Sequence, residues 1–198
     1  MRQLDDQFVS VMEDSLRTGV EIDLGSGHQK LVATWATKVA LLIELFLHDF
    51  IAQNPQVEVG RTFVPSDNLH TFLINSKPPD GTTVWLGAID HTAFHPFSSI
   101  GGAIFGAPAG PVEGIARGEL CGYQSIFNLR DVVFGVRGWA KEYAANLPRG
   151  MADPEQTASG KTVQIWPRVS EIQHWPPPRG PLTPEEVKAL AWTDEDPS

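Results

Sequence analysis

The segment DHTAFHP, residues 90–96, carries the side chains whose types and spacing come closest to a metal site. His91 and His95 lie four residues apart, and Asp90 adjoins them. On a helix, histidines at this spacing share one face and could bind a metal with the aspartate as a third ligand. The preceding residues have the pattern of a strand, however, and Pro96 would break a helix there. We therefore interpret the segment as a surface loop, predict no metal site and no cofactor, and keep a metal-dependent hydrolase as the alternative.

Two further groups of residues could bind a small ligand or a nucleotide. The segment from Ser98 to Gly110 is rich in glycine, and backbone amides near Gly101 and Gly102 could hold an anion. It lacks the Gly-Lys-Ser/Thr ending of a phosphate-binding loop, so close packing of strands explains the glycines better. Trp166 and Trp175 each precede a proline in polar surroundings, where their rings could line a groove. A C-terminal segment latched to the protein would explain them equally well.

No complete motif for nucleophilic catalysis occurs in the chain. The pattern G-x-S-x-G is absent, which disfavours a serine hydrolase. Cys121 is the only cysteine, so neither an internal disulfide nor a cysteine-rich zinc site can form. We interpret it as a small buried apolar side chain. His48 precedes Asp49 near the end of a helical segment, where a histidine complements the helix dipole. The sequence thus favours a protein that is not an enzyme.

The composition favours a compact acidic protein. The chain has 198 residues, a formal charge of −9 and a pI of about 5.0, with 41% hydrophobic and 20% charged residues. These fractions are ordinary for a globular protein. A negative surface repels phosphate backbones, and the lysines and arginines are scattered, so nucleic-acid binding is not expected. The first residues lack the apolar core of a signal peptide, and no apolar run could span a bilayer. We expect a cytoplasmic protein without membrane contacts.

The N-terminal part has the pattern of two helices. From Gln3 to Arg17 apolar residues recur at helical spacing among acidic ones, which predicts an amphipathic helix. The stretch from Gln29 to Phe50 is apolar nearly all round, which predicts a mostly buried helix that ends before Asn54-Pro55. Its mid-helix charges, Lys38 and Glu44, are six residues apart and cannot form an i,i+4 pair. The seam predicted to face the core consists of Leu31, Trp35, Val39, Leu42 and Phe46.

The rest of the chain alternates mainly between strand and turn patterns. The expected strands are Val20–Leu24, Val57–Val64, Thr82–Ile89, Phe97–Phe105, Leu120–Leu129, Val132–Val136 and Val163–Trp166. Short helices are expected at Ser66–Ile74, at Trp139–Asn146 and, after a Thr183-Pro184-Glu185-Glu186 capping box, up to Ala191. These elements predict an α+β fold, with an N-terminal helical hairpin whose long buried helix packs on an antiparallel β-sheet, and with a short C-terminal helix. We expect a single domain over residues 1–192 and a flexible tail at 193–198.

Four stretches of the chain resemble, in the same order, a group of actinobacterial and phage proteins labelled HNH-endonuclease-like. The stretches are LVATWATKVALLIEL at 31–45, PPDGTTVWLGAI at 78–89, IWPRVSEIQHWPPP at 165–178 and LTPEEVKALA at 182–191. The resemblance covers most of the chain. In that group, the shared region follows a zinc-binding nuclease module that ends in Cys-x-x-Cys-Asn-x-Gly-Trp-Met and runs into a helix.

The resemblance implies the scaffold of this group without its catalytic part. The start Met1-Arg2-Gln3-Leu4-Asp5 looks like the tail of the module's last element, whereas its cysteines and histidines are absent. No catalytic residue therefore carries over. The chain is expected to be a natural short form, a sequence started at an internal methionine, or the remainder of a longer nuclease. We expect an accessory domain that binds a protein partner or self-associates, and a phage-encoded copy could act on a host or defence factor.

Overall fold

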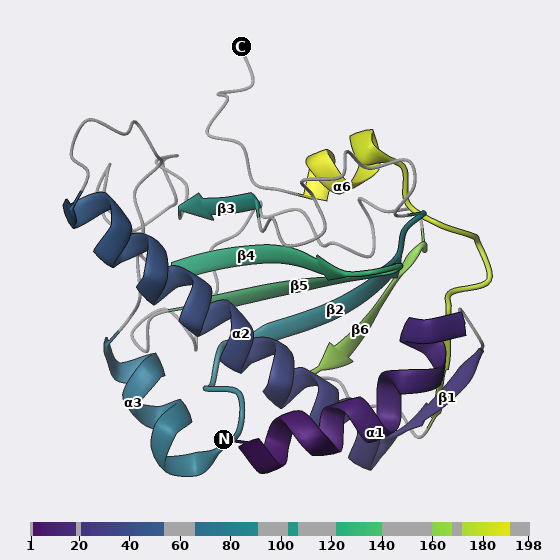
Figure 1. Ribbon diagram of the computed structural model, residues 1–198, viewed down its shortest axis with the longest axis horizontal. Helices are drawn as coiled ribbons and strands as arrows, with labels where there is room; N and C mark the ends of the chain where they lie inside the picture. The colour runs from purple at the N-terminus through teal and green to yellow at the C-terminus, as the bar shows by residue number, and fades with distance from the viewer. Residues whose placement is uncertain are drawn as a thin grey trace.

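The computed structural model describes residues 2–18, 21–53, 66–90, 103–106, 122–139, 160–167 and 172–190 (Figure 1). The helices are α1 (Arg2–Thr18), α2 (Ser26–Gln53), α3 (Ser66–Asn75) and α6 (Pro184–Leu190). The strands are β1 (Ile22–Gly25), β2 (Thr83–Ala88), β3 (Ala103–Gly106), β4 (Gly122–Leu129), β5 (Val132–Trp139), β6 (Thr162–Trp166) and β7 (Ile172–Trp175). The fold is α+β, as the sequence predicts.

A five-stranded antiparallel sheet forms the centre of the fold. Its strand order is β3-β4-β5-β2-β6, and β1 and β7 form a separate antiparallel pair. The helices α1 and α2 form an N-terminal hairpin, and α2 crosses one face of the large sheet (Figure 1). The turn before β2 contains Gly81, whose φ of 78° is readily adopted only by glycine. The position of α2 on this sheet confirms the prediction of a long helix packed on an antiparallel sheet.

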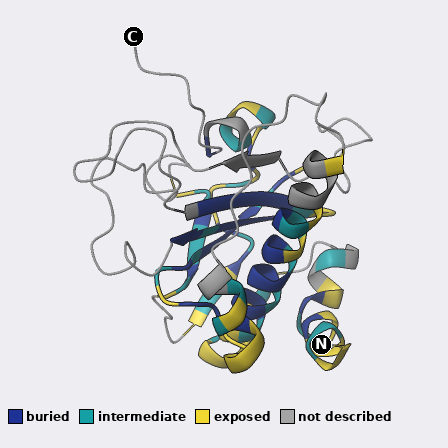
Figure 2. Cartoon of the chain, turned by 90° about the vertical axis from the view of Figure 1, so that its left-hand side faces the viewer, coloured by how far each residue is buried: buried dark blue, intermediate teal, exposed yellow. Residues whose placement is uncertain are grey.

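The part of α2 that packs in the core agrees only partly with the seam predicted from periodicity, of which Trp35 and Val39 pack against the core. Leu42 and Phe46 of that seam are 48% and 68% exposed, so the prediction is wrong for them. Three alanines on the buried side allow the helix backbone to approach the sheet closely, where the rings of Phe127 and Phe134 fill the space. Figure 2 shows buried residues of α2 and of the sheet gathered where the two meet. The fully buried side chains of α2 are Gln29, Val32, Ala33, Ala36, Thr37, Ala40, Leu41 and Glu44.

The first helix covers one side of α2 and supplies a partner for its lysine. The rings of Phe8 and Trp35 stack with centroids 3.6 Å apart. Asp5 Oδ1 accepts hydrogen bonds from Lys38 Nζ at 2.5 Å and from Trp35 Nε1 at 3.2 Å. The hydrogen bond from Lys38 is the main reason why the pKa of Asp5 lies below its usual value. Lys38 of α2 thus forms its ion pair with Asp5 of α1, because Glu44 of its own helix is six residues away.

The opposite face of the sheet carries a smaller apolar cluster with α6. Trp85, Ile126 and Val133 point to this face and are buried together with Leu182 and Leu190. Gln124 Nε2 donates to the carbonyl of Leu190 at 2.8 Å, which ties the end of α6 to β4. The short C-terminal helix is therefore part of the packed structure.

The capping box at the start of α6 forms as the sequence predicts. Glu186 N donates to Thr183 Oγ1 at 3.2 Å, and Thr183 N donates to Glu186 Oε2 at 2.7 Å. Lys161 Nζ lies 2.8 Å from the same carboxylate oxygen, and its hydrogen bond is the largest cause of the lowered pKa of Glu186.

Replacing Thr183 by alanine should lower the free energy of unfolding by about 1 kcal/mol, because one backbone N–H of α6 loses its acceptor. Chemical denaturation would measure the change. Thr183→Ser keeps the hydroxyl and should retain nearly full stability. An alanine variant as stable as the wild type would contradict a role for this cap.

The strand β5 extends beyond its predicted end, β7 was not predicted, and several predictions fall outside the described residues. The strand β5 continues to Trp139, and β7 follows β6, which the sequence assigned as the last strand. The structure does not describe residues 54–65, 91–102, 107–121 and 140–159. The strand expected at Val57–Val64, most of the helix expected at Trp139–Asn146 and the residue Cys121 therefore lie outside the described residues. Within the described residues, none of the helices combines the length and the apolar character that crossing a membrane requires.

Candidate functional site

The candidate metal ligands predicted from the sequence lie mostly outside the described residues. Asp90 is exposed and follows Ile89, which forms a bridge to Leu182 after the end of β2. His91 and His95 are not described, nor are Gly101 and Gly102 of the glycine-rich segment. In the described part of the chain, no three His, Cys, Asp or Glu side chains gather closely enough to hold a metal ion. The interpretation of these two segments, as a loop without a metal site and as closely packed glycines, therefore stays a prediction.

The two tryptophans predicted as ligand-binding candidates have different surroundings. Trp175 ends β7 and is only 2% exposed, so its ring is covered by the core and offers no open face to a ligand. This position agrees with the alternative of a C-terminal segment latched to the protein. Trp166 ends β6, is partly buried against the core and lines a cavity. Of the two, Trp166 is the one that a ligand could reach.

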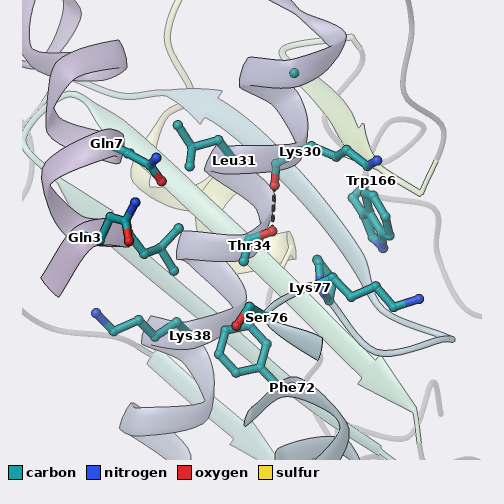
Figure 3. Close-up of a pocket in the computed structure, with 13 residues that line it drawn as sticks. Gln3, Gln7, Lys30, Leu31, Thr34, Lys38, Phe72, Ser76, Lys77 and Trp166 are labelled. Atoms are coloured by element: carbon teal, nitrogen blue, oxygen red, sulfur yellow. Dashed lines mark hydrogen bonds between the residues drawn. The ribbon is translucent and has the colours of Figure 1, made fainter. Parts of the chain in front are cut away.

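The cavity lies between the helical hairpin, α3 and the end of β6, and its volume is about 590 Å³ (Figure 3). One face of α2 forms its longest wall, and α1 and the turn after α3 form others. Apolar side chains and polar side chains both contribute to the lining. The described lining residues are Gln3, Leu4, Gln7, Gly27, Lys30, Leu31, Thr34, Lys38, Phe72, Ser76, Lys77, Pro78 and Trp166.

The cavity is positively charged although the chain as a whole is acidic. Three of its lining residues are lysines, and none of the described lining residues is acidic. Lys38 is neutralised by Asp5, as described above. Lys30 and Lys77 have no ion-pair partner among the described residues, and both extend toward the side on which Trp166 lies (Figure 3). Two uncompensated ammonium groups and an aromatic ring therefore face one space.

A second unusual group is the carboxyl of Glu44, which is enclosed between α2 and β4. Its side chain has no exposed surface, and Oε1 accepts a hydrogen bond from Ser125 Oγ at 2.9 Å. The other oxygen, Oε2, has no hydrogen-bond partner among the described residues. Burial raises the pKa of Glu44 from 4.5 to about 7, against the opposing effect of the Ser125 hydrogen bond. Near neutral pH this carboxyl is therefore partly protonated.

Tyr123 adds a second buried polar group on the same face of β4 as Ser125. Its hydroxyl is buried and has no hydrogen-bond partner among the described residues. Burial, together with the charge of Glu44, raises the pKa of Tyr123 above its usual value. Carboxyl and phenol groups with raised pKa values are typical of acid–base sites. Neither side chain lines the cavity, however, so we assign both to the contact between helix and sheet.

A histidine–aspartate pair occurs on the small β1–β7 sheet, where the sequence analysis named no candidate. His174 Nδ1 lies 2.5 Å from Asp23 Oδ1, and the two residues face each other across the strands. Their side chains are 79% and 65% exposed. An ion pair in such a position contributes little to stability and holds no substrate. We interpret it as a cross-strand surface contact.

Comparison with protein-family models, with curated proteins and with solved structures finds no match for this chain. The roles assigned to the cavity and to the buried carboxyl therefore rest on their own geometry. The cavity is the better candidate for a functional site, because a ligand can enter it, whereas Glu44 is enclosed.

Of the two uncompensated lysines and the tryptophan that line the cavity, only the tryptophan was a candidate in the sequence. Trp166 was recognised by its position before a proline in polar surroundings. Lys30 and Lys77 belong to α2 and to the turn after α3, and each looks like an isolated surface charge in the sequence. Two signals were available in the sequence. Lys30 lies in the first turns of a helix that is predicted to be buried, and Lys77 directly precedes Pro78. Only the packing of α3 beside α2 brings them to one space.

Proposed function

We propose that this chain is a non-catalytic protein-interaction domain, and that it associates with a second copy of itself through the outer face of α2. The observation that carries the proposal is the exposure of Leu42 and Phe46, at 48% and 68%. These residues are four positions apart on the helix, so they lie on one face. Large apolar side chains in an exposed row are typical of contact surfaces, because association removes their area from water.

The distribution of charge on α2 supports contact between two copies. A net charge of −9 opposes association in general. Between Val39 and Phe46, however, the only charged residue is Glu44, which is fully buried. Over residues 39–46, two copies can therefore meet without bringing like charges together. A two-fold dimer needs a surface that is complementary to itself, and one apolar helix face against its own copy satisfies this condition.

The resemblance to HNH-endonuclease-like phage proteins gives the proposal its setting. In this setting the chain is the companion domain of a nuclease module, or a phage-encoded protein that binds a host or defence factor. We place it in the cytoplasm, because one lone cysteine suits a reducing compartment. The alternative is a metal-dependent hydrolase that uses Asp90, His91 and His95. Purified protein that contains no zinc or manganese, and whose melting temperature is unaffected by either, would count against this alternative.

The double substitution of Leu42→Ser with Phe46→Ser should weaken self-association at least about a hundredfold, because it removes two large apolar contacts from each copy. Gel filtration coupled to light scattering would measure the mass as a function of concentration. The matched control is Val9→Ser, because Val9 is also 48% exposed but lies on α1. If the double variant assembled as readily as the wild type, this face would not be the contact surface.

A further inference from the structure

We propose that the cavity between α1, α2, α3 and β6 binds an anionic small molecule with a planar ring, of the nucleoside monophosphate class. This inference does not depend on the proposed self-association, because neither Leu42 nor Phe46 lines the cavity.

The charge of the cavity selects an anion. The chain carries 24 acidic and 15 basic residues, yet three lysines and no acidic residue occur among the described residues of the lining. Asp5 compensates Lys38, which leaves the ammonium groups of Lys30 and Lys77 for a ligand. These two lysines come from different elements, so their convergence is not a consequence of helical spacing. Two ammonium groups at one site match a doubly charged phosphate.

The position of Trp166 adds a preference for a planar ring. One side of this residue packs against the core, which fixes the ring, and the residue also lines the cavity. Figure 3 shows Trp166 with Lys30 on one side and Lys77 on the other. A base that stacks on the indole would therefore keep its phosphate within the region of the lysines. Stacking of a base on an aromatic side chain is favourable for every base, so the geometry selects the class and not one nucleotide.

The size and polar lining of the cavity fit such a ligand. A volume of about 590 Å³ is typical of pockets that enclose small organic molecules. The side chains of Gln3, Gln7 and Ser76 provide hydrogen-bond donors and acceptors on the walls. Apolar contact is available from Leu31 and Phe72. A bare inorganic anion would leave most of this lining without contacts.

Isothermal titration calorimetry of the full chain tests the inference, with AMP, GMP, CMP, UMP, adenosine and inorganic phosphate as separate ligands and no added metal. We expect saturable binding of the monophosphates at micromolar to submillimolar concentrations. Adenosine and inorganic phosphate should each bind at least about tenfold more weakly, because adenosine lacks the phosphate group and inorganic phosphate lacks the base. Affinity for AMP should fall as the salt concentration rises, because the lysines are exposed.

The variants Lys30→Met and Lys77→Met should each weaken AMP binding at least about tenfold while keeping the aliphatic stem of the side chain. Trp166→Leu should weaken AMP more than phosphate. Lys161→Met is the matched control, because it removes the same charge outside the cavity and should bind AMP like the wild type. Melting temperatures of the free variants would show that they are folded. The proposal would be overturned by absence of monophosphate binding, by equal binding of phosphate and AMP, or by cavity lysine variants that bind AMP as tightly as the wild type.

Discussion

Replacing Glu44 by glutamine should change the free energy of unfolding differently at pH 8 and at pH 4. The change should be about 3 kcal/mol more favourable at pH 8. Burial raises the pKa of this carboxyl from 4.5 to about 7, and each unit of such a shift corresponds to about 1.4 kcal/mol. Glutamine has the same shape, carries no charge and can still accept the hydrogen bond from Ser125 through Oε1. The measurement is chemical denaturation of both proteins between pH 4 and pH 8.

The direction of the pH effect follows from the raised pKa. The folded protein binds this proton more tightly than the unfolded chain, so the full contribution is present below about pH 4.5 and is lost as the pH rises through about 7. The wild type should therefore lose stability relative to Glu44→Gln across this interval. The matched control is Glu13→Gln, which makes the same substitution at an exposed glutamate of α1. If the difference in unfolding free energy between Glu44→Gln and the wild type stayed constant with pH, the raised pKa of Glu44 would be contradicted.

Replacing Gly135 by alanine should destabilise the protein by about 3 kcal/mol, because the new methyl group would overlap the indole of Trp85. The two residues face each other across β2 and β5. A Cβ atom at Gly135 would lie 1.8 Å from Trp85 Cε2, and this tryptophan is only 1% exposed. The ring cannot move aside without disturbing the cluster under α6. Chemical denaturation would measure the loss.

Two controls identify steric overlap as the cause. Gly27→Ala introduces the same methyl group on α2, where nothing lies within 4 Å, and should leave stability equal or raise it by up to about 1 kcal/mol. Combining Gly135→Ala with Trp85→Leu should cost less than the sum of the two single changes, because the smaller side chain removes the overlap. If Gly135→Ala were as stable as the wild type, the close packing of Trp85 on β5 would be contradicted.

Local patterns predicted the fold where a few neighbouring residues determine the structure. The Thr183 and Glu186 capping box and the end of α2 before Pro55 each depend on the residues beside them. The pairing of β1 with β7 depends instead on segments at opposite ends of the chain. Sequence periodicity contains no information on such pairing, so β7 was not predicted as a strand.

The error in the predicted core-facing seam of α2, at Leu42 and Phe46, has a similar physical origin. The helix is apolar nearly all round, so periodicity could not decide which face packs on the sheet. The large side chains of Leu42 and Phe46 appeared suited to a core, whereas small alanines such as Ala36 and Ala40 face it. Helix–sheet packing selected the small residues, because the sheet supplies large aromatic rings. The cavity was unpredictable for a related reason, since its lysines converge only after α3 has packed beside α2.

The most direct test of the central claim, that this chain acts through contacts between folded domains, is sedimentation velocity of the unmodified protein over a wide range of concentrations. We expect a mass that rises with concentration from 21.7 kDa toward twice that value. We also expect that the Leu42→Ser, Phe46→Ser double variant stays at the lower mass. An unmodified chain that sediments at 21.7 kDa at every concentration would contradict self-association through α2.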